Sequence, residues 1–453
     1  LRTRRSVWRL RPIALIGLFL ILSLIFVYFY LIQYVVKKGP GSTVHVYNVE
    51  ETIPLQSNPP LEREGNTNDK NLRRVHISET TAIIPQKESE SYHIDVIDTT
   101  IVSTNKPNLA QELLGWDTVL LVICSNRPQY LERSLSYVVD YHPGNSLPIF
   151  ISEDGKSDQV FDVIQKMKEK LVQKGLNTVP VTHIHHPNTQ EYYPDGYYKL
   201  SSHFQWAFSQ VFQSNQIKRI IILEEDLQIA PDFFEFFAST LTMLDQDDTL
   251  LTISAWNDNG MKSLVKDPQQ LFRSDFFPGL GWMMTRKLWE ELAPKWPKAY
   301  WDDWLREPKQ RQGRHIIRPE ICRSFHFGSH GVSNAQYSQY LNSIQLNDQF
   351  ISFTTLDLNY LSLEEWNHQY LSKVRHAKLV TMENYDKRVK EEGLLEVRLI
   401  YQGFEGRSNS FSSLAEWSGA MDNVKANVPR TAYKGIVSLW KGNVKVHLVP
   451  QEF

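Results

Sequence analysis

Short buried-strand patterns that alternate with helical patterns constrain the fold of this chain more than any other feature. The first is Thr118–Cys124, which reads TVLLVIC, and comparable runs follow at 148–152, 179–185 and 219–223. Helical patterning, as at 159–174, separates them. Strands that alternate with helices predict a mostly parallel sheet with helices on both faces. We therefore expect an α/β fold in which ligands bind beyond the carboxyl ends of the strands.

Charged residues stand where three of these strands end. Arg127 lies in the loop after the first strand, and Asp154 follows the second. The strongest strand ends in the triplet Glu224-Glu225-Asp226. Three adjacent like charges repel each other, and a hard divalent cation such as Mg²⁺ or Mn²⁺, which prefers oxygen ligands, would relieve that repulsion. A solvated turn explains the triplet alone equally well, but the three positions together are the first indication of a nucleotide-type site.

A second acidic cluster, Asp302-Asp303, is flanked by Trp301 and Trp304. Indole rings lower the local water content, and desolvation keeps the pKa of a carboxylate from falling, which suits a general base. The alternative is that Asp303 serves as the N-cap of the next helix. Spacing alone leaves both the catalytic and the capping interpretation open.

The N-terminal segment predicts a membrane anchor. An arginine-rich tail, 1–12, precedes an apolar run at 13–36, which is followed by two lysines. The run exceeds the roughly 20 apolar residues that a spanning helix needs. The positive-inside bias places the tail in the cytosol and the rest of the chain across the membrane. A cleaved signal peptide is the alternative, but it would have a shorter apolar core followed by small residues.

Composition adds three limits. Residues 37–112 are polar and contain Pro59-Pro60, so we expect a loosely structured stem. The net charge of −2 gives the chain no overall attraction to nucleic acid, and no such partner is expected. Cys124 and Cys322 are the only cysteines of the sequence, which allows at most one disulfide.

Several longer motifs resemble one known family. They are EEDLQIAPDFFEFF (224–237), SAWNDNG (254–260), DFFPGLGW (275–282), PKWPKAYWDDW (294–304), FGSHGVS (327–333) and VPRTAYKGIV (428–437). Together they closely resemble the N-acetylglucosaminyltransferase I family, the α-1,3-mannosyl-glycoprotein 2-β-N-acetylglucosaminyltransferases. The resemblance runs from about residue 117 to the C-terminus.

The resemblance implies a GT-A glycosyltransferase fold, with a Rossmann-like mixed sheet, and a smaller C-terminal α/β domain. It places the catalytic domain at 113–328, a donor-closing loop at 329–341 and the C-terminal domain at 342–453. It further implies Mn²⁺ as cofactor, UDP-GlcNAc as donor and a high-mannose N-glycan on glycoproteins as acceptor. A single-pass type II position in the Golgi membrane, with a lumenal catalytic body, also follows from it.

The resemblance also assigns residue roles. Asp226 matches the protein ligand to Mn²⁺, and Asp302 matches the catalytic base. Glu225 stands where the family usually has an aspartate. The positions that match donor-binding residues are Arg127, Asp154, His203, Glu224, Glu225, Trp301 and Ser333.

The implied reaction is a single in-line displacement that inverts the anomeric carbon. Asp302 takes the proton from mannose O2, and the metal neutralises charge on the departing diphosphate. Two alternatives remain. One is a protein O-mannose β-1,2-N-acetylglucosaminyltransferase, and the other is a catalytically inactive sugar-binding homologue, against which the presence of Asp226 and Asp302 argues.

Overall fold

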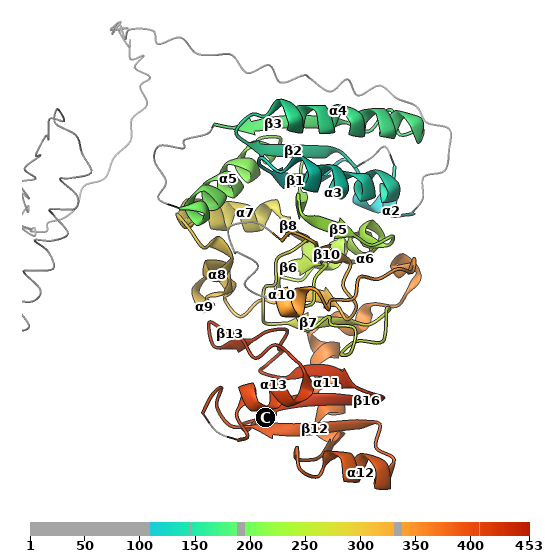
Figure 1. Cartoon of the computed structure of the whole chain (residues 1–453), viewed down its shortest axis with the longest axis vertical. Coiled ribbons are helices and arrows are strands. Elements are labelled where there is room, and N and C mark those ends of the chain that lie inside the picture. Colours follow the sequence, from blue (N-terminus) through green and yellow to red (C-terminus); the bar gives the residue numbers. More distant parts are fainter. Residues whose placement is uncertain (1–108, 145–146, 188–194, 330–337, 407) are drawn as a thin grey trace, which may run out of the picture. The chain divides into compact units, whose positions relative to one another are not determined.

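The computed structural model describes residues 109–144, 147–187, 195–329, 338–406 and 408–453 (Figure 1). They belong to one compact unit, His93–Phe453. The predicted tail and anchor lie outside the described residues, as do most of the predicted stem and Ser333 of the predicted donor-closing loop. Within the described ranges, no helix is long and apolar enough to cross a membrane.

An eight-stranded mixed sheet dominates the fold, with the strand order β3-β2-β1-β4-β8-β6-β9-β7. Its strands are β1 (Thr118–Cys124), β2 (Ile149–Asp154), β3 (Val181–His186), β4 (Arg219–Glu224), β6 (Leu250–Ser254), β7 (Leu271–Ser274), β8 (Trp282–Thr285) and β9 (His315–Pro319). The first four run parallel to one another, and β8 runs antiparallel to both of its neighbours. The expected α/β fold with a largely parallel sheet is confirmed.

Helices cover both faces of this sheet, as the sequence predicted (Figure 1). Alternate residues of β1 enter two different hydrophobic cores, because successive side chains of a strand point to opposite faces. Leu120 and Val122 pack in the core that contains α3 (Pro128–Tyr141), α4 (Asp158–Gln173) and α6 (Phe233–Gln246). Val119 and Leu121 pack in the core that contains α5 (Gly196–Val211) and α7 (Arg286–Leu292).

The second strand runs two residues further than its sequence pattern indicates. We expected it to end at 152, before two acidic residues, but β2 includes both Glu153 and Asp154. Its parallel pairing with β3 continues to the end, with Glu153 opposite His185 and Asp154 opposite His186. Because each carboxylate meets a histidine across the ladder, the acidic residues do not end the strand.

The C-terminal part of the chain forms a second, four-stranded sheet in the order β11-β12-β16-β15 (Figure 1). Its strands are β11 (Lys378–Leu379), β12 (Glu396–Tyr401), β15 (Val437–Lys441) and β16 (Val444–Pro450). The core of this sheet also contains Trp256, Leu264 and Cys322 from the preceding part of the chain. Both cysteines are buried and free. The predicted boundary at 342 stays a prediction.

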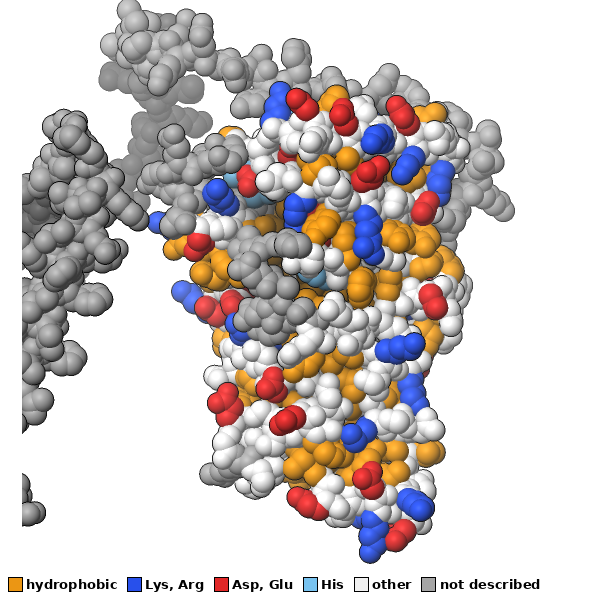
Figure 2. Space-filling view, viewed as in Figure 1, with side chains coloured by type: hydrophobic (Ala, Val, Ile, Leu, Met, Phe, Trp, Pro, Cys, Tyr) orange, Lys and Arg blue, Asp and Glu red, His pale blue; other side chains and the backbone are white. Residues whose placement is uncertain are grey.

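The remaining described helices are short or belong to the C-terminal region. They are α2 (Leu109–Leu114), α8 (Trp301–Arg306), α9 (Pro308–Arg311), α10 (Ser338–Leu341), α11 (Leu363–His376), α12 (Tyr385–Glu392) and α13 (Phe411–Ser418). Figure 2 shows acidic and basic side chains interspersed over the face that it draws. That pattern agrees with the nearly balanced net charge of the sequence.

A buried histidine after α3 makes the stability of this fold pH-dependent. His142 accepts a hydrogen bond at Nδ1 from the Gly144 amide (3.2 Å), and its Nε2 lies 3.0 Å from the Leu147 carbonyl oxygen. Burial lowers the pKa of His142 from 6.5 to about 4, so the folded state favours the neutral ring. The unfolded chain then binds more protons between these two values, and stability falls as the pH is lowered from 6.5 towards 4.

We expect His142→Gln to flatten the acid limb of the stability curve. The histidine contributes at most about 1.4 kcal/mol per pH unit in this window, since one pKa unit corresponds to that free energy. Urea unfolding at pH 7 and pH 5 measures the effect for both proteins. The exposed His376, changed to Gln, is the control. Equal pH dependence in wild type and His142→Gln would contradict the assignment.

Candidate active site

The carboxyl ends of β1, β2 and β4 lie at one edge of the sheet, side by side. In the ladders Cys124 pairs with Glu153, and Ile123 pairs with Glu224. Arg127, just before α3, therefore faces Glu225 and Asp226, which directly follow β4. The structure brings Arg127 together with Glu225 and Asp226, which the sequence placed at separate strand ends.

Glu225 is buried and held by two donors from the loop after β1. Its Oε1 accepts a hydrogen bond from Arg127 Nε at 2.6 Å, and its Oε2 accepts one from the Ser125 backbone amide at 3.1 Å. Burial raises the pKa of Glu225, although Arg127 opposes that shift. Both carboxylate oxygens of Glu225 are thus used to fix the loop that carries Arg127.

Asp226 lies between the Arg127 guanidinium and the His326 imidazole. Its Oδ2 is 3.0 Å from Arg127 Nη1 and 3.5 Å from His326 Nε2. Burial favours the neutral acid, but the hydrogen bond and charge of His326, together with Arg127, bring the pKa of Asp226 below its ordinary value. The carboxylate is therefore ionised.

His326 reaches Asp226 through a small antiparallel sheet that the sequence did not reveal. The strand β5 (Leu227–Ile229) follows Asp226 directly and pairs with β10 (Ser324–His326), so that His326 lies opposite Leu227. The Phe327 amide also donates to the Asp226 carbonyl oxygen at 3.0 Å. Burial lowers the pKa of His326, but the adjacent Asp226 outweighs it and raises that pKa above its ordinary value.

Glu224 and Asp226 provide oxygen donors that suit a hard divalent cation. Within the described part of the chain, the Glu224 carboxylate has no hydrogen bond, and neither does Oδ1 of Asp226. Burial, and next the charge of Asp226, raise the pKa of Glu224. A divalent cation would favour ionisation of both groups, so these residues fit the metal that the sequence predicted.

Gly328 lies directly against this carboxylate. A Cβ atom at Gly328 would stand 2.6 Å from Asp226 Oδ2, closer than such atoms approach in real structures, and 3.0 Å from Asp226 Cβ. Only a glycine therefore lets the chain after β10 pass over Asp226 in this conformation.

We expect Gly328→Ala to displace the Asp226 carboxylate and to weaken Mn²⁺ binding in the presence of UDP by about tenfold or more, as changes beside metal ligands do. Calorimetric titration measures this affinity. Ser329→Ala is the matched control, because it alters the next residue without adding an atom near Asp226. Unchanged Mn²⁺ affinity in Gly328→Ala would show that the metal does not depend on this carboxylate position.

The predicted donor residues Asp154 and His203 meet through a histidine that the sequence did not single out. His186 Nδ1 lies 2.8 Å from Asp154 Oδ1, and its ring stacks on His203 with centroids 5.2 Å apart. His203 Nε2 lies 2.8 Å from Ser152 Oγ. Burial, and next His186, lower the pKa of His203 to about 3, so its ring is neutral. This end of the edge offers the Asp154 carboxylate and the neutral imidazole of His203.

The second acidic cluster begins α8, and the alternative that Asp303 is its N-cap is wrong. The N-cap residue is Tyr300, which has a left-handed backbone with φ of 52° and makes no side-chain cap. Asp303 instead lies in the first turn, where it accepts from Arg306 Nη1 at 2.7 Å and from Lys425 Nζ at 3.0 Å. Burial opposes ionisation, but Lys425 and Arg306 lower the pKa of Asp303.

Asp302 is the more available of the two aspartates. Its Oδ2 accepts from Arg306 Nη1 at 2.8 Å, and its side chain is 42% exposed. Its Oδ1 has no hydrogen bond among the residues that the structure describes. The charge of Asp302 also contributes, after burial and Asp226, to the raised pKa of Glu224, so the two acidic clusters lie within electrostatic reach.

Trp301 lies in an aromatic core. Its ring stacks against those of Trp296, with centroids 5.8 Å apart, and Trp282, at 5.7 Å. The Trp301 side chain is buried. Its stacking in this core fixes the first turn of α8 and therefore the position of Asp302. The predicted contact of Trp301 with the donor stays a prediction, as does that of Ser333, which lies outside the described residues.

A cavity of about 590 Å³ lies at the other edge of the sheet, near the start of β4. Its lining includes Arg219, Asp245 and Thr285. Arg219 is engaged there by Asp245 and by Asp117, with Nη1 2.8 Å from Asp117 Oδ1. These pairs hold strand and helix ends together, and the cavity is far from the strand ends that carry the acidic clusters.

Comparison with known proteins gives agreement over most of the chain. The sequence model of the GNT-I family matches residues 16–453. The chain is 41% identical over 332 residues to the alpha-1,3-mannosyl-glycoprotein 2-beta-N-acetylglucosaminyltransferase of Arabidopsis thaliana, a match that covers 70% of each protein.

Two solved structures show a weaker similarity. The mannosyltransferase PcManGT from Pyrobaculum calidifontis, in complex with GDP-Man and Mn²⁺, is 15% identical with a TM-score of 0.34 and matches 53% of this chain and 63% of its own. TarS of S. aureus is 12% identical with a TM-score of 0.32 and matches 47% of this chain and 37% of its own. The match thus spans less than two thirds of either structure.

Proposed function

This chain belongs to the GNT-I family, and from that premise we propose that it transfers N-acetylglucosamine from UDP-GlcNAc to a glycoprotein N-glycan. The acceptor is the α-1,3-arm mannose of a high-mannose N-glycan, and the new linkage is β-1,2. The observation that carries this proposal is the 41% identity to an enzyme of that name over 332 residues. The two acidic clusters of the site support it. We assign the large domain to the GT-A class on the same basis.

Asp226 would hold the divalent cation, which we take to be Mn²⁺, and the neighbouring Glu224 would serve the donor sugar. When bound, the metal supplies positive charge beside the departing diphosphate. Arg127 forms ion pairs with both Asp226 and Glu225, and its Nε lies 2.6 Å from Glu225 Oε1. It thereby adds a second positive charge at the same place. The Arg127 side chain is partly buried, and a dielectric lower than that of water strengthens its attraction to a phosphate.

Asp302 would accept the proton of the mannose hydroxyl that attacks the donor. Its carboxylate is partly exposed, and its Oδ1 has no hydrogen bond to the residues that the structure describes, which leaves room for an acceptor sugar. Asp303, in contrast, is engaged by Arg306 and Lys425. The single displacement inverts the α-linked donor to a β-linked product, so no covalent intermediate on the enzyme is needed.

Two further residues that we propose bind the donor lie near the carboxyl end of β2. Asp154 and His203 would bind the nucleoside part of the donor, which a carboxylate and a neutral imidazole recognise through hydrogen bonds. Ser333 would close on the diphosphate. We further propose a Golgi membrane location through the apolar segment 13–36, with the catalytic body in the lumen.

Donor and acceptor profiling in the presence of Mn²⁺ tests the proposal. We expect UDP release from UDP-GlcNAc with a high-mannose N-glycan as acceptor. Little release is expected from UDP-galactose, or with an O-mannosyl peptide as acceptor. Preferred use of the O-mannosyl peptide would favour the related O-mannose transferase, and absence of any transfer would favour a sugar-binding homologue.

A further inference from the structure

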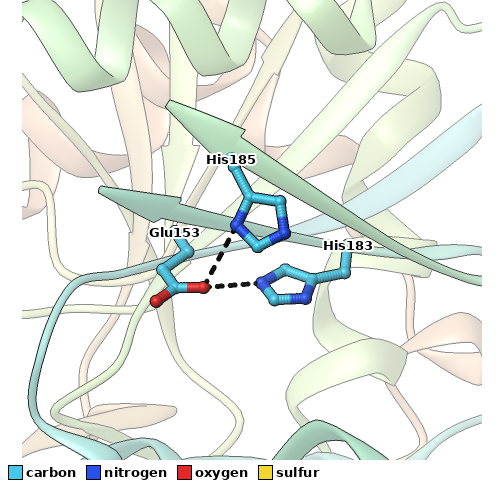
Figure 3. A group of neighbouring side chains, drawn as sticks. All are labelled: Glu153, His183 and His185. Carbon is cyan, nitrogen blue, oxygen red and sulfur yellow. Dashed lines mark hydrogen bonds and ion pairs between the residues drawn. The ribbon is translucent and has the colours of Figure 1, made fainter. Parts of the chain in front are cut away.

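We propose that Glu153, His183 and His185 form a second metal site, distinct from the acidic cluster at Asp226, and that its ligand set fits Zn²⁺ (Figure 3). One ligand atom from each residue lies within 4.8 Å of the other two. The loops that follow β1 and β4, which carry the first site, contribute no side chain to this group.

The sheet itself brings the three residues together. His183 and His185 are two positions apart on β3, so they point to the same face. Glu153 lies on the adjacent parallel strand β2, directly opposite His185 in the ladder. Asp154 and His186, the next pair, point to the other face, where His186 meets His203. The group therefore lies behind the predicted donor residues, across the thickness of the sheet.

Two imidazole nitrogens converge on one carboxylate oxygen. His183 Nε2 lies 2.9 Å from Glu153 Oε2, and His185 Nδ1 lies 3.3 Å from the same atom (Figure 3). Ligand atoms at about 2.0–2.2 Å from a tetrahedral zinc ion stand a little over 3 Å apart, so the two distances to Glu153 Oε2 need little change. The centroids of the two rings are 4.2 Å apart, and the ring planes are inclined to each other at 53°.

Burial makes a cation at this place favourable. The Glu153 side chain is only 1% exposed, and among the described residues its ion pairs are with these two histidines alone. A buried carboxylate is costly unless a charge or hydrogen bonds compensate it. Neutral imidazoles offer hydrogen bonds but no charge, whereas a divalent cation offers a full compensating charge.

The donor atoms decide which metal fits. Two imidazoles and one carboxylate suit zinc, with a water as the fourth ligand, whereas Mn²⁺ and Mg²⁺ prefer sites made of oxygen. The two sites of the protein are thus selective for different ions. The partly exposed edge of His185, whose side chain is 36% accessible, gives the ion a path from solvent.

Zinc titration of the full chain, stripped of metal and saturated with Mn²⁺ and UDP, tests the proposal. We expect one Zn²⁺ per chain in competition with a chromophoric chelator, and a higher thermal midpoint with Zn²⁺ than without it. Glu153→Gln and His185→Gln should each weaken binding by about 100-fold or more, the upper end for changes around a metal. Asp226→Ala should bind Zn²⁺ as wild type does.

Two controls make the result decisive. The exposed His376, changed to Gln, should leave Zn²⁺ binding unchanged. Because Glu153 is buried and its variant can fail to fold, His185→Gln at the accessible edge is the deciding variant. The proposal is overturned if wild type binds no Zn²⁺, or if His185→Gln binds it equally well. A hydrogen-bonded group without a metal would then be the correct description. Transferase activity is not the readout, so the proposed function stands or fails separately.

Discussion

Asp302→Asn is expected to bind UDP-GlcNAc almost as wild type does and to lower kcat by about 10²–10⁴-fold, the usual contribution of a general base. The amide keeps the shape of the side chain and a bond to Arg306, which donates to Asp302 Oδ2 at 2.8 Å. It cannot accept the proton of the attacking hydroxyl. Donor affinity by calorimetry and initial rates with a high-mannose acceptor separate the two effects.

Asp303→Asn is the matched control for this prediction. Asp303 lies on the same helical turn but bonds both Arg306 and Lys425, the latter on the hairpin of β13 (Val424–Lys425) and β14 (Val428–Pro429). We expect it to lose activity less than Asp302→Asn, through altered position and not through proton transfer. An Asp302→Asn protein with more than about half of wild-type activity would rule out the base, and Asp303 would be the next candidate.

Asp226→Ala is expected to abolish the mutual dependence of Mn²⁺ and UDP-GlcNAc binding. In wild type each ligand should improve the affinity for the other by the same factor, typically about 5–150-fold, because binding free energies are reciprocal. The structure offers one ionised carboxylate, Asp226, with an oxygen that has no hydrogen bond among the described residues. Titration calorimetry with each ligand alone and then with both measures the factor.

The variant Glu225→Asp tests whether the carboxylate next to Asp226 takes part in metal binding. The Glu225 carboxylate bonds Arg127 and the Ser125 amide, so we do not assign it to the metal. The variant should therefore keep the coupling between Mn²⁺ and nucleotide. Tight Mn²⁺ binding without nucleotide in wild type would mean that further protein ligands exist, and the assignment of a single ionised ligand would be wrong.

Much of the architecture follows from local sequence patterns. The apolar run Thr118–Cys124 and its successors predict buried parallel strands, and the structure confirms them within a few residues. The gathering of Arg127 with Glu225 and Asp226 also follows, because adjacent parallel strands end at the same edge. These inferences need only the periodicity of the chain and the geometry of a parallel sheet.

The missed residues depend on pairings between distant parts of the chain. His326 reaches Asp226 only because β10 pairs with β5, which lies about a hundred positions earlier in the sequence. Lys425 reaches Asp303 from a C-terminal hairpin. Such contacts have no local periodicity, so composition and spacing cannot indicate them.

The group of Glu153, His183 and His185 was missed for a related reason. The pattern VTHIH reads as a strand with alternating polar residues, and nothing in it says which neighbour the histidines face. The register of β2 against β3 decides this by placing Glu153 opposite His185. A shift of one residue would turn Asp154 to that face instead, because side chains alternate along a strand.

The structure of the reaction product tests the central claim most directly. The full chain is incubated with UDP-GlcNAc, Mn²⁺ and a high-mannose N-glycan, and the product is analysed by mass spectrometry and NMR. We predict one added N-acetylglucosamine, in β configuration, on O2 of the α-1,3-arm mannose. A product with an α linkage, or with the sugar on another mannose or another hydroxyl, would contradict the inverting mechanism or the proposed acceptor.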